Sequence, residues 1–570
     1  MLPLGDPSRR LTVGFAVVCV LLVVLGVRLV QLQGIDRTKL AAAATKQVTQ
    51  PTVIEAVRGR ILDRDGRVLA YTTAARTIVA DPEVVKDPVK TAGGLAPLLG
   101  KPAAELEQLL RRHTQYVRLA RDLTPTEAAR VLALKIDGIS SEDATQRVVP
   151  SVDAAGVVGF TSRDGVGLGG IEQEYDKQLS GTPGKLVVET GQDGQVIPSG
   201  PRTETAAVDG SSVRLTILED LQYEAQRTVA DAVRATGAKG GQVVVTDAHT
   251  GEVLAMASAP AYDPKKAVSG QVANPPVQSV FEPGSANKVV TFSAALDRGL
   301  ITPHTVLEVP GSIQVADRVV HDAWSHGIVK YTATGVLAKS SNVGTLMIAQ
   351  RLGPSAFYEY QRRFGSGSRT GIQLPAESEG LLPAPAQWSG STFGNLPIGQ
   401  GVAMTALQLA SMYQTIANDG VRVAPSIVRE IDGPGGKVTP TPARASTRVV
   451  SAATARTVRT MLEAVTQKGG TAPSAAIDDY LVAGKTGTAQ KINPRCGCYS
   501  GGGYWATFAG ITPADNPQFV ISVVIDDAKG GLHGGAVAAP VFKTIASYAL
   551  AQRGVAPSGK PSPTFQLTLD

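Results

Sequence analysis

The 570-residue sequence contains few cysteines, histidines and aromatic residues, and each shortage argues against a class of function. Its three cysteines are Cys19, Cys496 and Cys498, and no set of metal ligands forms around them. Six histidines are scattered without a His-Glu-x-x-His pattern, so we predict neither a metal nor a cofactor in the chemistry. Aromatic residues make up 5%, and no basic stripe is interleaved with them, which argues against nucleic-acid binding.

Long apolar runs are also scarce, since only one reaches the length of a membrane span. Residues 11–27 carry no charge and the apolar run continues beyond one arginine, so we predict a single-pass anchor at residues 11–33. Arg9 and Arg10 just before the run predict a cytoplasmic N-terminus, with the rest of the chain outside the plasma membrane. A cleaved signal peptide is the alternative, but its small-residue site at 41–44 lies well past the run.

An apolar fraction of 43% with 18% charged residues indicates a folded protein, and the net charge of +6 is small for this length. Short strands and helices succeed one another after the anchor, which is typical of an α+β fold. We predict five parts: a cytoplasmic tail (1–10), the anchor (11–33), a mixed α/β pedestal (34–205), a catalytic region (210–553) and a flexible tail rich in proline, glycine and serine (554–570).

Hydrophobic periodicity and turn residues predict the main elements of these parts. In the pedestal we expect a strand, turn and strand over 57–70 and helices at 102–113 and 125–134. In the catalytic region we expect helices packed on an antiparallel sheet. The expected helices are 221–235 and 538–553, and the expected strands are 241–247, 252–258, 481–490, 505–511 and 519–526.

Ser285 and Lys288 lie three residues apart at a predicted helix start, where Pro283 and Gly284 precede an apolar stretch. Residues three apart on a helix share a face, so the Lys288 amine can reach the Ser285 hydroxyl. A serine hydroxyl needs a neighbouring base to act as a nucleophile, and a neutral amine can be that base. Burial and a second cation, for which Lys485 is the candidate, would keep Lys288 neutral. The alternative is a serine helix cap beside a solvated lysine.

A second motif, Ser340-Ser341-Asn342, lies at a predicted loop or helix junction before a helical segment. Ser340 can relay a proton to a leaving amine, and Asn342 can hold a substrate peptide bond and orient Lys288. The alternative is local helix capping, because serine and asparagine side chains bond readily to nearby backbone groups.

A third motif, Lys485-Thr486-Gly487-Thr488, lies on a predicted strand. Lys485 with the hydroxyls of Thr486 and Thr488 can bind a substrate carboxylate, and Gly487 permits close approach of a ligand or backbone. The backbone N–H groups of Thr488 and Ser285 can together form an oxyanion hole. The alternative is a basic edge strand with a bend.

The three motifs, in this order within one region, resemble those of the class B high-molecular-mass penicillin-binding proteins. The resemblance extends over nearly the whole chain. Its pedestal part is carried by residues 58–66 and 170–181. Its catalytic part is carried by residues 282–285, 340–344, 370–375, 399–402 and 485–490.

The resemblance implies a single transmembrane helix, an elongated pedestal of the dimerisation type and a transpeptidase domain with an antiparallel five-stranded sheet flanked by helices. It implies a peptidoglycan D,D-transpeptidase in which Ser285 attacks the penultimate D-alanine carbonyl of a stem peptide and is acylated by β-lactams. Implied partners are stem peptides, β-lactams, a polytopic membrane glycosyltransferase and other division or wall-synthesis proteins. The Ser-Ser-Asn-Val-Gly form at 340–344 is more similar to division-type than to elongation-type enzymes, which favours septal synthesis.

Two segments depart from the family pattern. Ala286-Asn287 is an unusual pair between the serine and the lysine, where bulkier or hydroxylated residues are more common. The loop around Cys496 and Cys498 is idiosyncratic, and we predict that it rims the active site. Two free thiols and a strained bridge both remain open, because a disulfide between residues two apart is geometrically awkward.

Two other functions stay open at this point. One is a D,D-carboxypeptidase or a β-lactam-hydrolysing enzyme, which needs a second base to activate water, and Glu377 and Glu379 are its candidates. The other is a non-catalytic scaffold for wall synthesis or a β-lactam sensor. A scaffold with a dead site is expected to lack a key residue, and all three motifs are complete.

Overall fold

The structure is a computed structural model that describes residues 7–40, 49–162, 164–191, 196–200, 202–263, 274–493, 495–530 and 533–569. The chain divides into two compact units. The first combines Met1–Val57 with Gly181–Gly210, and the second combines Arg58–Ser180 with Ser211–Asp570. The catalytic motifs all belong to the second unit.

The first unit contains the apolar helix and a small sheet. Helix α1 (Pro7–Val30) continues into a π-helical turn (Gln31–Ile35), and together they are the single candidate membrane span among the described residues. None of the α1 side chains is buried, as expected for a helix whose apolar surface faces lipid. The sheet pairs β6 (Gly184–Glu189) with β1 (Thr49–Ile54) and β7 (Arg202–Thr205), all antiparallel. The predicted anchor lies within this helix, so the chain fits a membrane-anchored protein.

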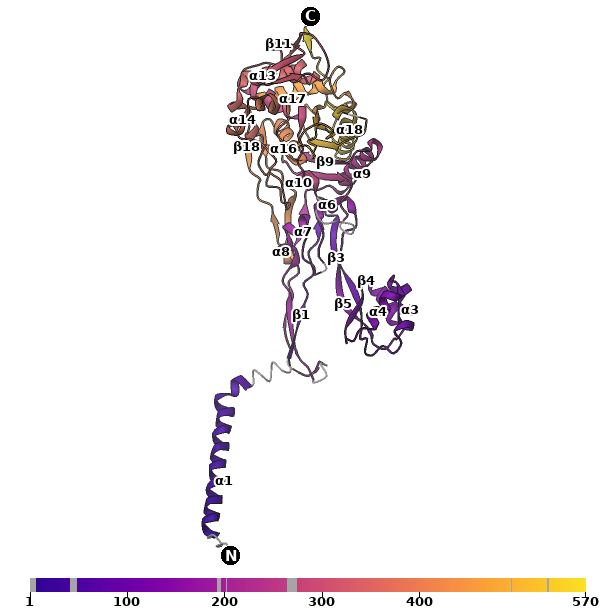
Figure 1. Cartoon of the computed structure of the whole chain (residues 1–570), viewed down its shortest axis with the longest axis vertical. Helices are drawn as coiled ribbons and strands as arrows, with labels where there is room; N and C mark the ends of the chain where they lie inside the picture. The colour runs from indigo at the N-terminus through magenta and orange to yellow at the C-terminus, as the bar shows by residue number, and fades with distance from the viewer. Residues whose placement is uncertain are drawn as a thin grey trace. The chain divides into compact units, whose positions relative to one another are not determined.

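The N-terminal part of the second unit is a small helix-and-sheet body (Figure 1). Its long strand β3 (Val68–Ala80) pairs with β4 (Val117–Leu123) and β5 (Ile139–Val148). Three helices pack with β3 and β4 in its separate apolar core, namely α3 (Pro88–Leu99), α4 (Ala103–Leu110) and α5 (Pro125–Leu132). Helix α5 starts as predicted, with proline at its first position and a capping box between Thr124 and Glu127.

A buried charge cluster joins the two pedestal segments that carry the family resemblance. Glu172, with no exposed surface, receives the Arg58 guanidinium at 2.7 Å and the Arg147 guanidinium at 2.6 Å. Arg58 also contacts Asp176 at 2.8 Å. These pairs compensate the loss of hydration of the buried charges, so residues around 58 and around 172 are held together.

The catalytic part of the second unit is built on a five-stranded antiparallel sheet of order β10-β9-β21-β20-β19. Phe508 of β20 packs on Phe542 of α18, whereas Ser522, paired with the next residue Ala509, bonds to the backbone of α16. Neighbouring residues of a strand point to opposite faces, so α18 and α16 cover opposite faces of the sheet. The bounds are β9 (Gly240–Asp247), β10 (Val253–Ala259), β19 (Ala483–Gln490), β20 (Tyr504–Thr512), β21 (Phe519–Asp526), α9 (Glu219–Thr236), α16 (Ala406–Ala417) and α18 (Gly534–Gln552).

The predicted α+β class with a five-stranded antiparallel sheet is confirmed. Each expected strand of the sheet agrees with the observed strand to within two residues at either end.

In the pedestal, β2 (Ile61–Leu62) is shorter than expected and pairs in parallel with β8 (Ser212–Leu215), which connects this region to the catalytic part. Other elements are α6 (Ala155–Val158), α7 (Gly170–Glu174), α8 (Asp176–Ser180), α10 (Pro275–Gln278), α14 (Pro354–Arg363), α15 (Thr392–Asn395), α17 (Ala452–Thr466), β15 (Val421–Val423), β16 (Val428–Asp432), β17 (Val438–Pro440) and β18 (Ser446–Arg448).

Composition suggested a flexible tail after residue 553, and the structure differs at its end. Strand β22 (Thr568–Leu569) pairs with β14 (Val329–Thr332), which also pairs with β11 (Val306–Val309). The backbone N–H of Thr332 donates to Leu567, and its hydroxyl donates to the carbonyl of Gln566. Proline and glycine prevent a helix here, but an extended segment can still add to an open sheet edge.

Candidate active site

Ser285 lies in a 3-10 turn (Gly284–Asn287) that leads directly into α11 (Lys288–Asp297). The turn lies close against β19, where a Cβ atom at position 487 would come within 2.3 Å of the Pro283 carbonyl oxygen. Gly487 therefore permits the contact between the turn and the strand, as the sequence predicted for a close approach. The unusual Asn287 is buried and donates its side-chain amide to the Leu396 carbonyl at 3.0 Å.

The Lys288 side chain is completely buried, and its amine faces neutral acceptors. Nζ donates to the Ser340 carbonyl oxygen at 2.6 Å and to Asn342 Oδ1 at 2.9 Å, and it lies 3.3 Å from the Ser340 hydroxyl oxygen. Burial lowers the pKa of Lys288 well below its ordinary value, the charge of Lys485 acts in the same direction, and Asp322 opposes them. A neutral amine is the form that can accept a proton.

Ser340 and Asn342 belong to the junction between two helices, as predicted. Helix α12 (Ala333–Lys339) ends at Ser340, whose φ of 62° is left-handed, and α13 (Asn342–Leu352) begins two residues later. The alternative of local capping is correct for Ser341, whose hydroxyl accepts the Gly344 N–H at 2.9 Å. Ser340 and Asn342 instead point their acceptors at Lys288.

Strand β19 is one of the two edge strands of the sheet and carries the third motif. Lys485 is fully buried, its amine donates to Thr486 Oγ1 at 3.3 Å, and burial lowers its pKa to about 7. Thr486 Oγ1 also lies 2.8 Å from the hydroxyl of Thr471. Thr488 Oγ1 accepts the N–H of Gly534 at 3.4 Å.

The three motifs meet at one cavity of about 480 Å³. Five predicted site residues line it, namely Ser285, Ser340, Asn342, Thr486 and Thr488, while the buried Lys288 and Lys485 stand behind its wall. Sequence reasoning assigned no role to the other lining residues, among which Trp324, Gln400, Thr471 and His533 carry aromatic or polar side chains. Gln400 lies within the Gly-Gln-Gly-Val segment used for the family resemblance, which was the available signal. Among the described residues, no cluster of acidic, histidine and cysteine side chains could hold a metal ion.

The described residues of the cysteine loop contact the segment before Ser285 but do not line this cavity. Cys496 and Cys498 form a disulfide, which decides between the two thiol states left open by the sequence. The next residue, Tyr499, donates its hydroxyl to the Glu282 carboxylate at 2.9 Å, and Glu282 also accepts the Gly401 N–H at 2.9 Å. The expectation that the loop rims the site therefore needs correction for its described residues, because the loop acts on the segment before Ser285.

The two glutamates proposed for water activation lie away from the cavity wall. Glu377 accepts hydrogen bonds from the backbone N–H groups of Thr370 and Gly371 and from the Thr370 hydroxyl, so its carboxylate stabilises a turn. Neither Glu377 nor Glu379 lines the cavity. The hydrolytic alternative therefore has neither of its two candidate glutamates at this cavity.

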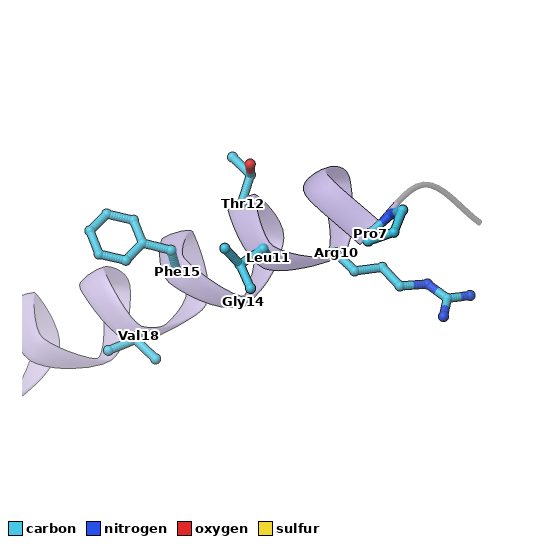
Figure 2. Close-up of a pocket in the computed structure, with 7 residues that line it drawn as sticks. All are labelled: Pro7, Arg10, Leu11, Thr12, Gly14, Phe15 and Val18. Carbon is cyan, nitrogen blue, oxygen red and sulfur yellow. The ribbon is translucent and has the colours of Figure 1, made fainter. Parts of the chain in front are cut away.

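A second hollow lies on the membrane helix and has a different character. Its lining comes entirely from α1, and Figure 2 shows these side chains leaving a single ribbon. The residues are Pro7, Arg10, Leu11, Thr12, Gly14, Phe15 and Val18. A depression on one exposed apolar helix is suited to contact with lipid or another helix, and it presents no convergent polar groups for catalysis.

Comparison with known families agrees with the site. The model of the penicillin binding protein transpeptidase domain matches residues 241–547, and the model of the penicillin-binding protein dimerisation domain matches residues 53–215. The chain belongs to the penicillin-binding proteins. The combination of these two domains is that of class B, so the predicted family is confirmed.

Relatives of this penicillin-binding protein cover almost its full length. Penicillin-binding protein PbpB of Mycolicibacterium smegmatis is 44% identical over 98% of this chain and 92% of the relative. Peptidoglycan D,D-transpeptidase FtsI of Escherichia coli is 35% identical over 93% of this chain and 89% of the relative. The crystal structure of penicillin binding protein 3 from Mycobacterium tuberculosis, complexed with ampicillin, has a TM-score of 0.73 at 42% identity. It covers 91% of this chain and 100% of that one.

Proposed function

We propose that this penicillin-binding protein is a serine-type peptidoglycan D,D-transpeptidase and a target of β-lactams. The observation that carries the proposal is the buried Lys288 amine, which donates only to neutral acceptors behind the cavity that Ser285 lines. A relative named peptidoglycan D,D-transpeptidase and a solved relative complexed with ampicillin support the same activity.

In the proposed acylation, Lys288 removes the Ser285 hydroxyl proton as Oγ forms a bond to the penultimate D-alanine carbonyl carbon. The bond from that carbon to the nitrogen of the terminal D-alanine then breaks. The leaving nitrogen receives the proton through the Ser340 hydroxyl, which lies 3.3 Å from Lys288 Nζ. An amine from a neighbouring stem peptide attacks the ester, forms the new amide and returns the proton to Ser285.

The remaining motif residues bind and stabilise the acyl donor in this proposal. Lys485 with the hydroxyls of Thr486 and Thr488 binds the terminal carboxylate, and Asn342 holds the peptide bond while orienting Lys288. The backbone N–H groups of Ser285 and Thr488 form the oxyanion hole, which Gly487 supports by letting the nucleophile turn lie against β19. Removing one such donor typically lowers the rate about a hundredfold.

We also propose the topology and the cellular setting. The predicted anchor carries a cytoplasmic N-terminus, and the pedestal (34–205) and transpeptidase domain (210–553) lie outside the membrane. Septal wall synthesis is favoured by the Ser-Ser-Asn-Val-Gly segment and by relatives named FtsI and PbpB. A polytopic membrane glycosyltransferase is the expected partner, because class B proteins lack a glycan-polymerising domain of their own.

The test is covalent labelling of the full-length protein with a fluorescent penicillin. Ser285→Ala is expected to abolish labelling, whereas the control Ser279→Ala, six residues upstream, is expected to label like the parent. Mass spectrometry of the labelled peptide should place the adduct on Ser285. Labelling that survives in Ser285→Ala, or sustained turnover of nitrocefin by the parent, would contradict a β-lactam-trapped transpeptidase.

A further inference from the structure

Asp322 is a buried carboxylate beside the second catalytic motif that sequence reasoning did not detect. It follows β13 (Arg318–His321), which forms a hairpin with β12 (Ser312–Val315), and its side chain has no exposed surface. Its Oδ1 accepts the backbone N–H groups of Asn342 and Val343, the latter at 3.0 Å. Its Oδ2 accepts the Ser341 hydroxyl at 2.7 Å.

These contacts make Asp322 the anchor for the start of α13. The first N–H groups of a helix have no partner within the helix and need an external acceptor. Asp322 satisfies those of residues 342 and 343, and Ser341 satisfies that of Gly344. Ser341 is itself oriented by donating to Asp322, so one carboxylate fixes the backbone position of the whole helix start. A negative charge at this end also complements the helix dipole.

The same chain segment fixes the side chain of Asn342. Its amide nitrogen donates to the His321 carbonyl at 3.1 Å, so its carbonyl oxygen must face the other way. That oxygen accepts the Lys288 amine at 2.9 Å. Residues 321 and 322 therefore determine both where Asn342 lies and which atom it presents to Lys288.

His326 links this anchor to the cavity. Its Nε2 lies 2.9 Å from Asp322 Oδ2 and its Nδ1 lies 2.7 Å from the Gly327 carbonyl. Both partners are oxygen acceptors, so both contacts are hydrogen bonds only when each ring nitrogen carries a proton. The ring stacks on Trp324, with centroids 5.5 Å apart, and Trp324 lines the cavity.

We propose that Asp322 and His326 are positioning residues for acylation, which hold Asn342 at the Lys288 amine and support the Trp324 wall of the cavity. The inference rests on the proposed transpeptidase function. Asp322 acts through Asn342 and does not itself touch the reacting atoms in this account. Misplacement of a reacting group by about 1 Å can lower a rate about a hundredfold, which sets the scale of the expected effect.

The first experiment compares Asp322→Asn with the parent by the second-order rate of labelling with a fluorescent penicillin. The expected loss is about tenfold to a hundredfold, because asparagine keeps the shape but offers one acceptor oxygen instead of two. The control is Asp317→Asn, a carboxylate on the same hairpin with 74% exposure, which is expected to label like the parent. Thermal unfolding of each variant reports how much protein is folded, and rates are expressed per folded molecule.

Two readouts separate positioning from a general loss of structure. Asp322→Asn and Asn342→Ala are expected to be strongly non-additive, since one acts through the other. The charged groups acting on Lys288 are Lys485 from β19 and Asp322, and Asp322 raises the Lys288 pKa. Its neutralisation is therefore expected to move the acidic limb of the acylation profile to lower pH. A structural loss alone would lower the rate at every pH without moving the limb.

His326 variants keep the inference testable if Asp322→Asn folds poorly. His326→Gln retains one N–H donor for Asp322 and is expected to lose less activity than His326→Ala. Equal rates for His326→Ala and the parent would overturn the role of His326. An Asp322→Asn rate within about twofold of the parent, or effects of Asp322→Asn and Asn342→Ala that simply multiply, would overturn the role of Asp322. These results leave the proposed function intact, because its own failure would already show as an unlabelled parent protein.

Discussion

The pedestal and the active site both bury charged side chains, but they treat the charge in opposite ways. In the pedestal, Glu172 has no exposed surface and receives two guanidinium groups at 2.6 and 2.7 Å. In the active site, Lys288 and Lys485 are equally buried, face neutral acceptors and repel one another. A buried ion with a partner stays charged, whereas one without a partner tends to lose its charge. The first arrangement holds two chain segments together, and the second is suited to the base that we propose.

The largest expected effect comes from replacing Lys288, a buried lysine without an ion-pair partner. Lys288→Met removes the amine but nearly conserves the buried volume, so acylation by a fluorescent penicillin should fall by about a thousandfold. Thermal stability should be unchanged or higher, because the variant no longer has to bury an amine. Lys543→Met, at an exposed position of α18, is the matched control. A Lys288→Met protein that keeps a tenth of the parent rate would exclude Lys288 as the base.

Neutralising the ion-paired Glu172 in the pedestal should lower the stability of the protein without changing its acylation rate. Glu172→Gln leaves the buried Arg147 guanidinium without its counter-charge and leaves Arg58 with Asp176 alone, so it should lower the free energy of unfolding by about 3–5 kcal/mol. Acylation per folded molecule should match the parent. Denaturant unfolding measures the first quantity, and Glu107→Gln, whose partner Arg111 is on the surface, provides the control. A loss of stability no larger than that of the control would show that the ion pairs of Glu172 do not hold the pedestal segments together.

The pH dependence of acylation should reflect both lysines. Lys288 must lose its proton to act as a base, which gives a rising limb at low pH. Lys485 must keep its proton to bind a carboxylate, and its pKa of about 7 predicts a falling limb near neutrality. Measuring the second-order labelling rate across pH should therefore give a bell shape, and Lys485→Met should lack the alkaline limb. A parent rate that rises steadily above pH 8 would contradict this assignment.

Lys485 should also leave a signature in stability. Its pKa is about 7 in the folded protein and near 10.5 when unfolded, so the unfolded state binds more protons between these values. The free energy of unfolding should then rise with pH between about 7 and 10.5. As the pH falls through this range, this gain in stability is lost, because the Lys485 amine takes up a proton in the unfolded state before it does so in its buried site. Lys485→Met should show a smaller rise than the parent in chemical unfolding at pH 7 and pH 9.

The smallest expected effect concerns Glu282. Its charge has neither the ion-pair partners of Glu172 nor the complete burial of Lys288. Its carboxylate is partly buried with neutral partners, and burial raises its pKa while the bonds from Gly401 and Tyr499 oppose the rise. Tyr499→Phe should slow acylation by about threefold, because one of several hydrogen bonds to Glu282 is lost. The double Cys496→Ser and Cys498→Ser variant should stay closer to the parent, since backbone hydrogen bonds between Asn493 and Cys498 also hold the loop. A larger loss of acylation rate in the cysteine variant than in Tyr499→Phe would show that the disulfide, and not the Tyr499 hydroxyl, holds the loop against Glu282.

The elements of the sheet and the motif residues were predictable because their signals are local. Alternating apolar residues give the strands, and a serine three residues before a lysine gives a shared helix face. For Ser340-Ser341-Asn342 the sequence left two interpretations open, local helix capping and contact with Lys288. Both occur, since Ser341 caps a helix while its two neighbours face Lys288.

Asp322, Trp324 and His533 were not predictable because their roles depend on contacts between distant segments. Asp322 lies 19 to 21 residues before the groups that it binds at the start of α13, at no helical or strand spacing. The end of the tail was misjudged for a related reason. Composition describes what a segment does alone, whereas pairing with β14 depends on an edge supplied by residues more than 230 positions earlier.

The docked C-terminus has a practical consequence for anyone attaching a reporter to this protein. Thr332 caps α12 through the Gly335 N–H and also binds Gln566, and α12 ends at Ser340. A Cβ atom at position 335 would come within 1.9 Å of the Leu567 carbonyl, so the final residues lie directly on the first turn of that helix. We therefore expect a fluorescent domain fused behind these residues to disturb their pairing with β14 and the start of α12, the helix that precedes Ser340, the proposed proton relay.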